Sequence, residues 1–430
     1  MSWSKAFKSS IRAAVIMLAL VGAWLAAAEG MAEAQAPPFQ VPPVVSARYL
    51  LPSDMLSGSL FTVDDRVPTD GYMGHFTLRS QLGTFPVVSK NLLKTRIAEL
   101  PAIQQLDQMS QTEVFLSGMA NAAARPVEAA VNIVANPVQT VENLPSGIGR
   151  FFDRVEAGAE SIAQAATNSS TTSQQKVEQT AARVGDVTIT ALGYEQVRRQ
   201  LAKGLGVDPY TTNPVLAEKL TNTAWVAFSG RVGVELLVSA VVPGSMAVGA
   251  TSFTNDLVYD TPNADLILLN KQKMITMGAS EGLADELIKN RWYSLTVLTS
   301  LVTELERLAG VAGQPSVLAL ATTAENEEEA RFVAASVQML AKLNVTGVPL
   351  KELAARRTVV GITPDNAIVV PAPVDYLSWT ESIARVAERL DLRAPRRGLW
   401  RTGQMSAVAQ QSFSSLGVCR SNSGDSRQNG

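Results

Sequence analysis

The sequence predicts an α+β protein that is predominantly α-helical, with a helical bundle-like core, a small N-terminal antiparallel β meander, and a C-terminal β-hairpin followed by a helix. Three observations lead to this fold class. Apolar residues recur at helical spacing through most of the 430 residues. Residues 46–89 instead contain short β-rich runs separated by turn residues such as those of PTDGY. A second pair of β-rich runs surrounds the turn residues TPDN in RTVVGITPDNAIVV.

The N-terminus has the pattern of a secretory signal peptide. Basic residues come first, an apolar run of secretory length follows, and an A-x-A cleavage site then lies among small residues. These parts are Lys5, Lys8 and Arg12, then residues 13–28, then Ala32–Ala34. We therefore expect residues 1–34 to be removed and the mature chain to begin at Gln35, in the periplasm or outside the cell. The alternative is an uncleaved signal anchor, for which the apolar run is rather short.

Composition shifts along the chain divide it into further segments. Residues 35–45 are a proline-rich spacer, and residues 157–182, which include TNSSTTSQQ, are predicted to be a flexible linker because they hold few large apolar side chains. The predicted division is a β meander plus helices over 46–156, a helical domain ending in the β-hairpin and helix over 183–391, and a disordered tail over 392–430.

Within these segments, local signals place the helices. Pro101 is expected to interrupt or kink the first of them. Asn213 followed by Pro214 marks the start of a helix, and Gly310 marks the end of another. The tetrapeptides SQTE at 110–113 and SWTE at 378–381 have the form of capping boxes. The predicted apolar stripes are Tyr194, Val197 and Leu201; Leu298, Leu301, Leu305 and Leu308; Phe332, Val333, Val337 and Leu340; and Trp379, Ile383, Val386 and Leu390.

Residues 232–251 form the longest apolar run after the N-terminus and raise the question of a membrane span. The run is free of charge between Glu235 and Asp256, but it contains glycine, serine and threonine, and Pro243–Gly244 would break a helix at its middle. A bent, buried helical segment is the favoured interpretation. Stable spanning, and reversible insertion as a helical hairpin, are the alternatives.

Composition also excludes several chemistries. With 37 basic against 39 acidic residues the formal charge is −2, so no global field attracts nucleic acid. The single cysteine, Cys419, rules out an intrachain disulfide, and with the single histidine, His75, it leaves too few ligands for a zinc cage. Phosphate-binding glycine loops do not occur in the sequence, and His75 would have to serve as the only imidazole beside a nucleophilic serine. We accordingly assign no catalytic, cofactor-binding or metal-binding residue and expect no cofactor.

A few local patterns have simpler structural explanations. His75 is expected at the surface or edge of the meander, with a general base or pH sensor as the alternative. Ser173–Lys176 matches S-x-x-K, but the match lies inside the predicted linker. The acidic clusters indicate turns rather than calcium sites, and the basic run indicates a solvated tail rather than a surface for an anionic partner or membrane. These clusters are Asp64–Asp65; Asp256, Asp260, Asn263 and Asp265; and Arg393–Arg401, which includes Trp400.

Three functions remain open. The favoured one is an exported, non-enzymatic protein that binds an unidentified protein or envelope partner, or has a structural role in the cell envelope. The first alternative is a peripheral or membrane-inserting helical protein, with weak membrane association through residues 232–250. The second is a carboxylate-based hydrolase, because an acidic pair needs proximity in space rather than a sequence motif. Two acidic side chains brought together from distant segments would favour this last hypothesis.

Overall fold

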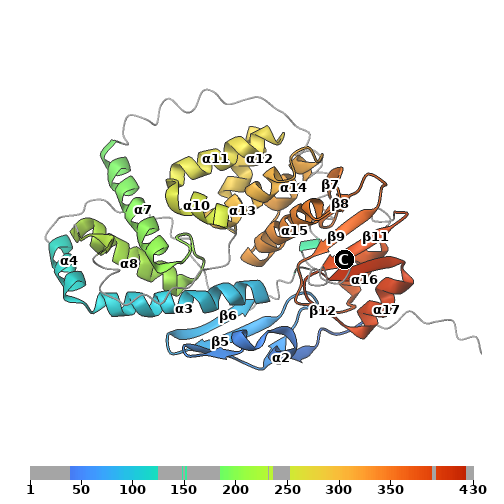
Figure 1. Cartoon of the computed structure of the whole chain (residues 1–430), viewed down its shortest axis with the longest axis horizontal. Helices are drawn as coiled ribbons and strands as arrows, with labels where there is room; N and C mark the ends of the chain where they lie inside the picture. The colour runs from blue at the N-terminus through green and yellow to red at the C-terminus, as the bar shows by residue number, and fades with distance from the viewer. Residues whose placement is uncertain are drawn as a thin grey trace, which may run out of the picture. The chain divides into compact units, whose positions relative to one another are not determined.

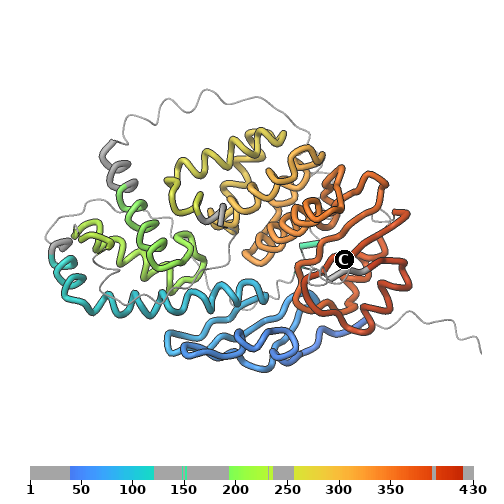
Figure 2. The backbone as a smooth tube through the Cα atoms, in the orientation of Figure 1, coloured from blue at the N-terminus to red at the C-terminus, as the bar shows by residue number. Residues whose placement is uncertain are grey.

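The computed structural model describes residues 39–123, 148, 151–152, 185–230, 232–235, 252–389 and 394–422 (Figure 2). The predicted signal peptide and linker lie outside these residues, as do Ser173, Lys176 and Arg393. Of the apolar run at 232–251, only residues 232–235 are described. By its contacts the chain divides into Met1–Phe39 and Gln40–Gly430, and all the described helices and strands belong to the second of these. The fold is mixed α+β with several sheets.

The first sheet is four-stranded and antiparallel, in the order β2-β3-β5-β6, with bounds Ser57–Gly58, Phe61–Val63, His75–Ser80 and Gly83–Val88. It differs from a simple meander because β4 (Arg66–Pro68) leaves the run and pairs with β1 (Val44–Ser46). The short helices α2 (Ala47–Leu50) and η1 (Ser53–Met55) lie between β1 and β2. Phe76 and Leu78 alternate with exposed or half-buried residues along β5, so one face of the sheet is apolar.

Four helices accompany this sheet: α3 (Lys90–Ser110), α4 (Glu113–Ala123), α7 (Gly185–Leu205) and α8 (Pro214–Gly230). Helix α3 continues through Pro101, which was expected to interrupt or kink it. Asn213 caps α8 as predicted, accepting a hydrogen bond of 3.1 Å from Val215 N. At SQTE the cap is Thr112, whose Oγ1 accepts from Phe115 N, because Ser110 still belongs to α3.

A series of helices then leads to the C-terminal sheet: α10 (Ser252–Asp260), α11 (Asn263–Thr276), α12 (Glu281–Lys289), α13 (Leu295–Glu306), α14 (Gln314–Thr322) and α15 (Glu327–Val345). The predicted stripes of α13 and α15 are buried. Gly310 does not end α13 as predicted, because the helix ends at Glu306 with Arg307 as its C-cap, and Gly310 adopts a positive φ of 87° in the turn that follows. Asn326 caps α15 by accepting a hydrogen bond from Glu329 N. Among the described residues, the structure contains no helix with the length and apolar character that crossing a membrane requires.

The C-terminal sheet has five strands in the order β13-β11-β9-β8-β7. Their bounds are Val418–Asn422, Arg397–Arg401, Ile368–Ala372, Val359–Ile362 and Glu352–Ala355. Strands β8 and β9 are antiparallel across the TPDN turn. Strands β9, β11 and β13 are parallel and are joined through α16 (Glu381–Glu388) and α17 (Ala407–Ser415), as a parallel connection requires (Figure 1).

This sheet corrects the prediction of a disordered tail over 392–430, because residues 394–422 form two of its strands and a helix. Disorder was predicted because this segment is polar, rich in serine and arginine, and without the apolar periodicity that marks a helix or strand. Its strands are too short to show such a periodicity. Leu399 and Trp400 of β11 are buried between neighbouring strands and helices, and this burial offsets the weak local preference of the segment.

The order strand, short strand, helix occurs twice in this region. It is formed first by β9, β10 (Tyr376–Leu377) and α16, and then by β11, β12 (Gln404–Met405) and α17. Strands β10 and β12 pair in parallel, and each precedes a capped helix. The caps are Thr380 for α16 and Ser406 for α17. The second capping box is thus shifted, since Thr380 rather than Ser378 caps α16. Gln40 joins the two copies of this arrangement: its Oε1 accepts from Trp379 N at 2.8 Å and from Ser406 Oγ at 2.5 Å. Part of the predicted spacer is therefore bound to the fold.

Two large apolar clusters hold the described residues together. One joins the N-terminal sheet and α3 to α7 and α8, and so combines residues from both sides of the predicted linker. The other joins α11–α15 to the C-terminal sheet, α16 and α17, and includes Ile148, Phe151 and Phe152. Sheet residues contribute to both clusters, so the apolar packing is shared between helices and strands. The packing does not follow the predicted division at residues 157–182.

Candidate functional site

Polar and titratable side chains gather where the start of α3 meets the loop after β9 and the start of α15. Asp375, in the loop after β9, is only 7% exposed. Its Oδ2 accepts hydrogen bonds from Gly74 N at 3.1 Å and from Lys90 N at 2.9 Å. Burial raises the pKa of Asp375 to about 6, and the hydrogen bonds from Gly74 and Lys90 oppose that rise.

Glu328, in the first turn of α15, has a strongly raised carboxyl pKa. Burial raises its pKa to about 9, and repulsion from Asp70, Glu329 and Asp375 adds to the rise. Its Oε1 is buried with no hydrogen-bond partner. A carboxyl group with this pKa holds its proton at pH 7. Glu328 is therefore an acid among carboxylates, as in sites where environments separate the pKa values of neighbouring acids.

Asp70 completes this acidic cluster from the loop before β5. Its Oδ1 accepts hydrogen bonds from Tyr72 N at 2.8 Å and Met73 N at 2.6 Å. Its Oδ2 has no hydrogen-bond partner and lies 3.7 Å from His75 Nε2. We call Asp70, Glu328 and Asp375 the acidic cluster. Its three members come from segments more than 40 residues apart, so the chain fold alone brings them together.

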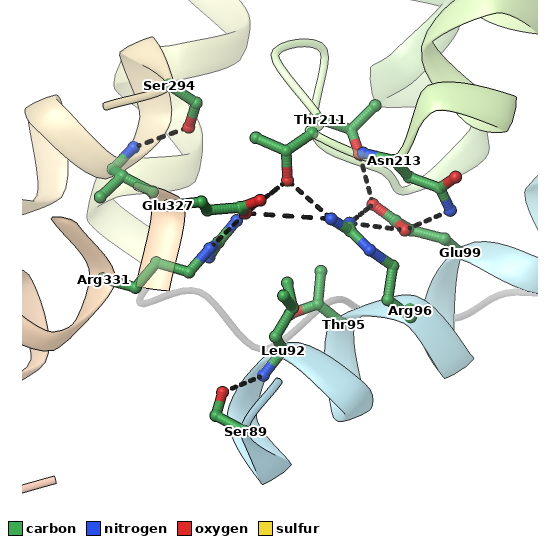
Figure 3. A network of polar contacts seen from close by, with 12 residues as sticks. Ser89, Leu92, Thr95, Arg96, Glu99, Thr211, Asn213, Ser294, Glu327 and Arg331 are labelled. Carbon is green, nitrogen blue, oxygen red and sulfur yellow. Dashed lines mark hydrogen bonds and ion pairs between the residues drawn. The ribbon is translucent and has the colours of Figure 1, made fainter. Parts of the chain in front are cut away.

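A second polar network lies further along α3 (Figure 3). Arg96 Nη1 donates to Glu99 Oε2 at 3.0 Å, and both side chains are buried. Glu99 also accepts from Thr211 Oγ1 at 2.5 Å and from Asn213 Nδ2 at 2.8 Å. Every acceptor bond of Glu99 thus comes from α3 or from the turn that starts α8, and the network fixes one against the other.

The same network extends to α15 through Glu327. Arg331 Nε donates to Glu327 Oε1 at 2.6 Å, and Arg96 Nη2 lies 3.9 Å from the same oxygen (Figure 3). Thr212 Oγ1 contacts both Arg96 Nη2, at 2.7 Å, and Glu327 Oε1, at 2.6 Å. Burial alone would raise the pKa of Glu327, but the two guanidinium groups outweigh it and lower the pKa. The pKa values of the adjacent residues Glu327 and Glu328 are thus shifted in opposite directions.

An apolar cavity of about 80 Å³ lies beside these networks, among the parallel strands, α15, α16 and α17. Its walls include β9 and β11, Ile383 and Ala387 of α16, and four aromatic side chains: Tyr72, Phe152, Phe332 and Phe413. Phe152 packs edge to face with Tyr72, at a centroid distance of 5.5 Å, and with Phe332, at 5.6 Å. The cavity can hold a small apolar molecule, because its lining is almost entirely hydrocarbon.

The residues singled out from the sequence mostly have structural partners. Asp64 receives two hydrogen bonds from Arg79, and Asp65 one from Ser46. Asp260 pairs with Lys203 at 2.6 Å. Within the described part of the chain, no group of three or more His, Cys, Asp or Glu residues is placed to hold a metal ion, and this includes the acids of 256–265. Cys419 is exposed on β13.

The basic run at 393–401 requires a correction, because it is not a solvated tail. Arg397 and Arg401 begin and end β11, and Trp400 is buried. The guanidinium of Arg397 donates to the carbonyl oxygens of Ala387, at the end of α16, and Leu416, at the end of α17. It thereby satisfies helix carbonyls that have no partner within their own helix.

His75 is the first residue of β5, which lies between β3 and β6 rather than at the edge of the sheet, and its side chain is partly exposed. Its proximity to Asp70 places it at the margin of the acidic cluster, which sequence reasoning missed. In the sequence, Asp70 is part of the turn PTDGY, and Glu328 is one of several glutamates favoured by the helix dipole. No local pattern marks Asp375. The chain matches no protein-family model, and no curated protein or solved structure is significantly similar to it.

Proposed function

We propose that this chain is an exported, non-enzymatic protein of the cell envelope, periplasmic or secreted, whose role is to bind a small apolar ligand. The apolar cavity between the C-terminal sheet and its helices carries the proposal. Binding sites for small molecules are concave and largely apolar with few polar groups, and this cavity has that character. The signal-peptide pattern of residues 1–34 supports export.

The charged residues that join α3, α8 and α15 also favour binding over catalysis. Arg96, Glu99 and Glu327 are used to join α3, α8 and α15, so their bonds are already made inside the protein. Arg397 is the charged residue among those that line the cavity, and its guanidinium donates hydrogen bonds to carbonyl oxygens at the ends of α16 and α17. Groups engaged in this way support the fold around the cavity.

Export is tested by expressing the full chain in a bacterium and measuring the mass of the protein in the periplasmic fraction and the medium. We expect a mature chain that begins at Gln35. A variant with Lys5, Lys8 and Arg12 all changed to Glu should stay inside the cell with its N-terminus intact, because export requires the basic region. Retention of the unchanged chain in the cytoplasm at full length would refute export.

A carboxylate-based hydrolase is the second candidate, and the acidic cluster favours it. Glu328 holds a proton at neutral pH and could act as a general acid, while Asp70 or Asp375 could act as a base or nucleophile. Purified chain is incubated with small ester and glycoside substrates, beside Glu328→Gln and Asp70→Asn. Selective turnover that both variants abolish would establish this candidate in place of the first. Equal background rates in all three proteins would eliminate it.

A further inference from the structure

Two members of the acidic cluster lie close in sequence to aromatic side chains that line the apolar cavity. Asp70 comes two residues before Tyr72, in the loop before β5. Glu328 comes four residues before Phe332, one turn along the same face of α15. Phe152 packs edge to face with both rings, at 5.5 Å from Tyr72 and 5.6 Å from Phe332. The same two segments therefore set the separation of the two acids and the separation of the two aromatic walls.

Hydrogen bonds from the acidic cluster hold the loop that carries Tyr72. Asp70 Oδ1 accepts from the backbone N–H groups of Tyr72 and Met73. Asp375 Oδ2 accepts from Gly74 N at 3.1 Å, and the backbone N–H of Asp375 donates to Tyr72 O at 2.9 Å. The position of Tyr72 in the cavity wall therefore depends on two residues of the cluster.

Glu328 adds a titratable group to these acids from α15, and its Oε1 is buried without a hydrogen-bond partner. Burial raises the pKa of Asp375 to about 6, so Asp375 is mostly ionised at pH 7. Ionised Glu328 is repelled by Asp70 and Asp375, and repulsion between buried charges is only weakly screened by salt. The titratable groups that surround Glu328 are Asp70, Asp375 and Glu329, with His75 beside Asp70 and Lys90 beside Asp375.

We propose that the acidic cluster is a proton switch for the apolar cavity: the cavity binds its ligand while Glu328 is protonated and releases it when that proton passes to solvent. The negative charge on Glu328 then repels Asp70, and the start of α15 moves away from the loop before β5. This movement separates Phe332 from Tyr72 and opens the wall that the two rings form with Phe152. The inference rests on the proposed binding function and adds to it the regulation of the same site by pH.

The test measures the affinity of the purified chain for fluorobenzene by fluorine-19 NMR between pH 7 and pH 10. This probe is apolar and neutral at every pH, so pH acts on its binding only through the protein. Burial and repulsion raise the pKa of Glu328 to about 9, so about one chain in ten keeps the proton at pH 10. The apparent Kd should therefore rise about 10-fold across this range. Circular dichroism follows global folding in the same samples.

Three variants assign the pH dependence to the cluster. Glu328→Gln cannot ionise, so its affinity for fluorobenzene should be the same at pH 7 and at pH 10. Asp70→Asn keeps an acceptor oxygen for Tyr72 N but removes a charge that repels Glu328, so the rise in Kd should begin at a lower pH and be smaller. Glu381→Gln is the matched control, because Glu381 is exposed in the first turn of α16, a helix that also lines the cavity. Its Kd should rise as that of the unchanged chain does.

Several outcomes would overturn the switch while binding at the cavity stands. These are an affinity that does not change with pH, an equal loss of affinity in Glu328→Gln, and a loss that coincides with global unfolding. If Glu328→Gln does not fold, Asp70→Asn decides, and an unaltered pH dependence in that variant contradicts the switch.

Ala387→Leu fills the cavity from α16 and locates the probe. Fluorobenzene should bind this variant much more weakly at pH 7, and binding that survives the change would place the probe elsewhere and overturn the inference. If the unchanged chain does not bind fluorobenzene at pH 7, the proposed binding function fails as well.

Discussion

Asp375 accepts a hydrogen bond of 2.9 Å from the backbone N–H of Lys90, a residue 285 positions earlier in the chain. Lys90 begins α3, so the carboxylate lies at the helix N-terminus, where free N–H groups and the helix dipole favour negative charge. Gly74 N donates to the same oxygen. One side chain thereby joins the loop after β9 to the sheet and helix of the N-terminal region.

This contact predicts unequal effects of two substitutions. Asp375→Ala leaves the N–H groups of Gly74 and Lys90 without an acceptor and should lower the free energy of unfolding by about 2–4 kcal/mol. Asp375→Asn keeps an acceptor oxygen and should cost less than half as much. Urea denaturation at pH 7 measures both. Equal losses in the two variants would mean that the side chain acts through its charge or its packing.

Glu328 predicts a dependence of stability on pH. The unfolded carboxyl releases its proton near its ordinary pKa of 4.5, whereas the folded protein holds it to about pH 9. Stability that depends on the neutral form is therefore fully present below pH 4.5 and is lost as the pH rises toward 9. Glu328→Gln, which is permanently neutral, should match the unchanged chain at about pH 4.5 and exceed it by about 1 kcal/mol or more at about pH 8.

The control for this measurement is Glu113→Gln, because Glu113 is an exposed glutamate in the first turn of α4. Its stability should follow that of the unchanged chain across the whole pH range. A Glu328→Gln variant that is less stable than the unchanged chain at pH 8 would show that the carboxyl is ionised in the folded protein.

The buried Arg96–Glu99 pair should be far more sensitive than an exposed one. Arg96→Met leaves Glu99 buried without its counter-ion and should cost about 3 kcal/mol or more, whereas Arg96→Met with Glu99→Leu should recover part of that loss. Arg79→Met breaks the exposed pair with Asp64 and should cost much less, because solvent screens an exposed pair despite its good geometry. Similar losses in the two single variants, by chemical denaturation, would contradict the burial of Arg96.

Leu399 distinguishes a packed C-terminal sheet from a disordered tail. It is 6% exposed on β11, between β9 and β13, and belongs to the apolar cluster of that region. Leu399→Ala should lower the free energy of unfolding by about 2–5 kcal/mol. Ser414→Ala, at an exposed position on α17, should stay within about 0.5 kcal/mol. A neutral Leu399→Ala would restore the prediction of a tail.

Much of the local structure could be predicted from short stretches of sequence. Asn213–Pro214 starts α8, and the stripes of α13 and α15 are buried as their spacing indicates. Each of these features depends on residues within one or two helical turns, where capping geometry and periodicity act directly. The two predicted helix caps were each wrong by two residues. Thr112 caps α4 in place of Ser110, and Thr380 caps α16 in place of Ser378.

The candidate sites could not be predicted in this way. Asp70, Glu328 and Asp375 are ordinary acidic residues in their own segments, and only their burial together shifts the pKa values of Glu328 and Asp375.

The sequence by itself determined the start of α8, the buried stripes of α13 and α15, and the small number of histidine and cysteine residues that restricts the chemistry of this protein, and it is the basis of the proposal that the protein is exported. The tertiary structure decided that residues 394–422 add two parallel strands to the mixed C-terminal sheet and that α3 is joined to the loop after β9. The physical reason is the separation along the chain over which each interaction acts. Capping and periodicity act over a few residues, whereas strand pairing, desolvation and the repulsion between Asp70 and Glu328 depend on segments that only the folded chain brings together.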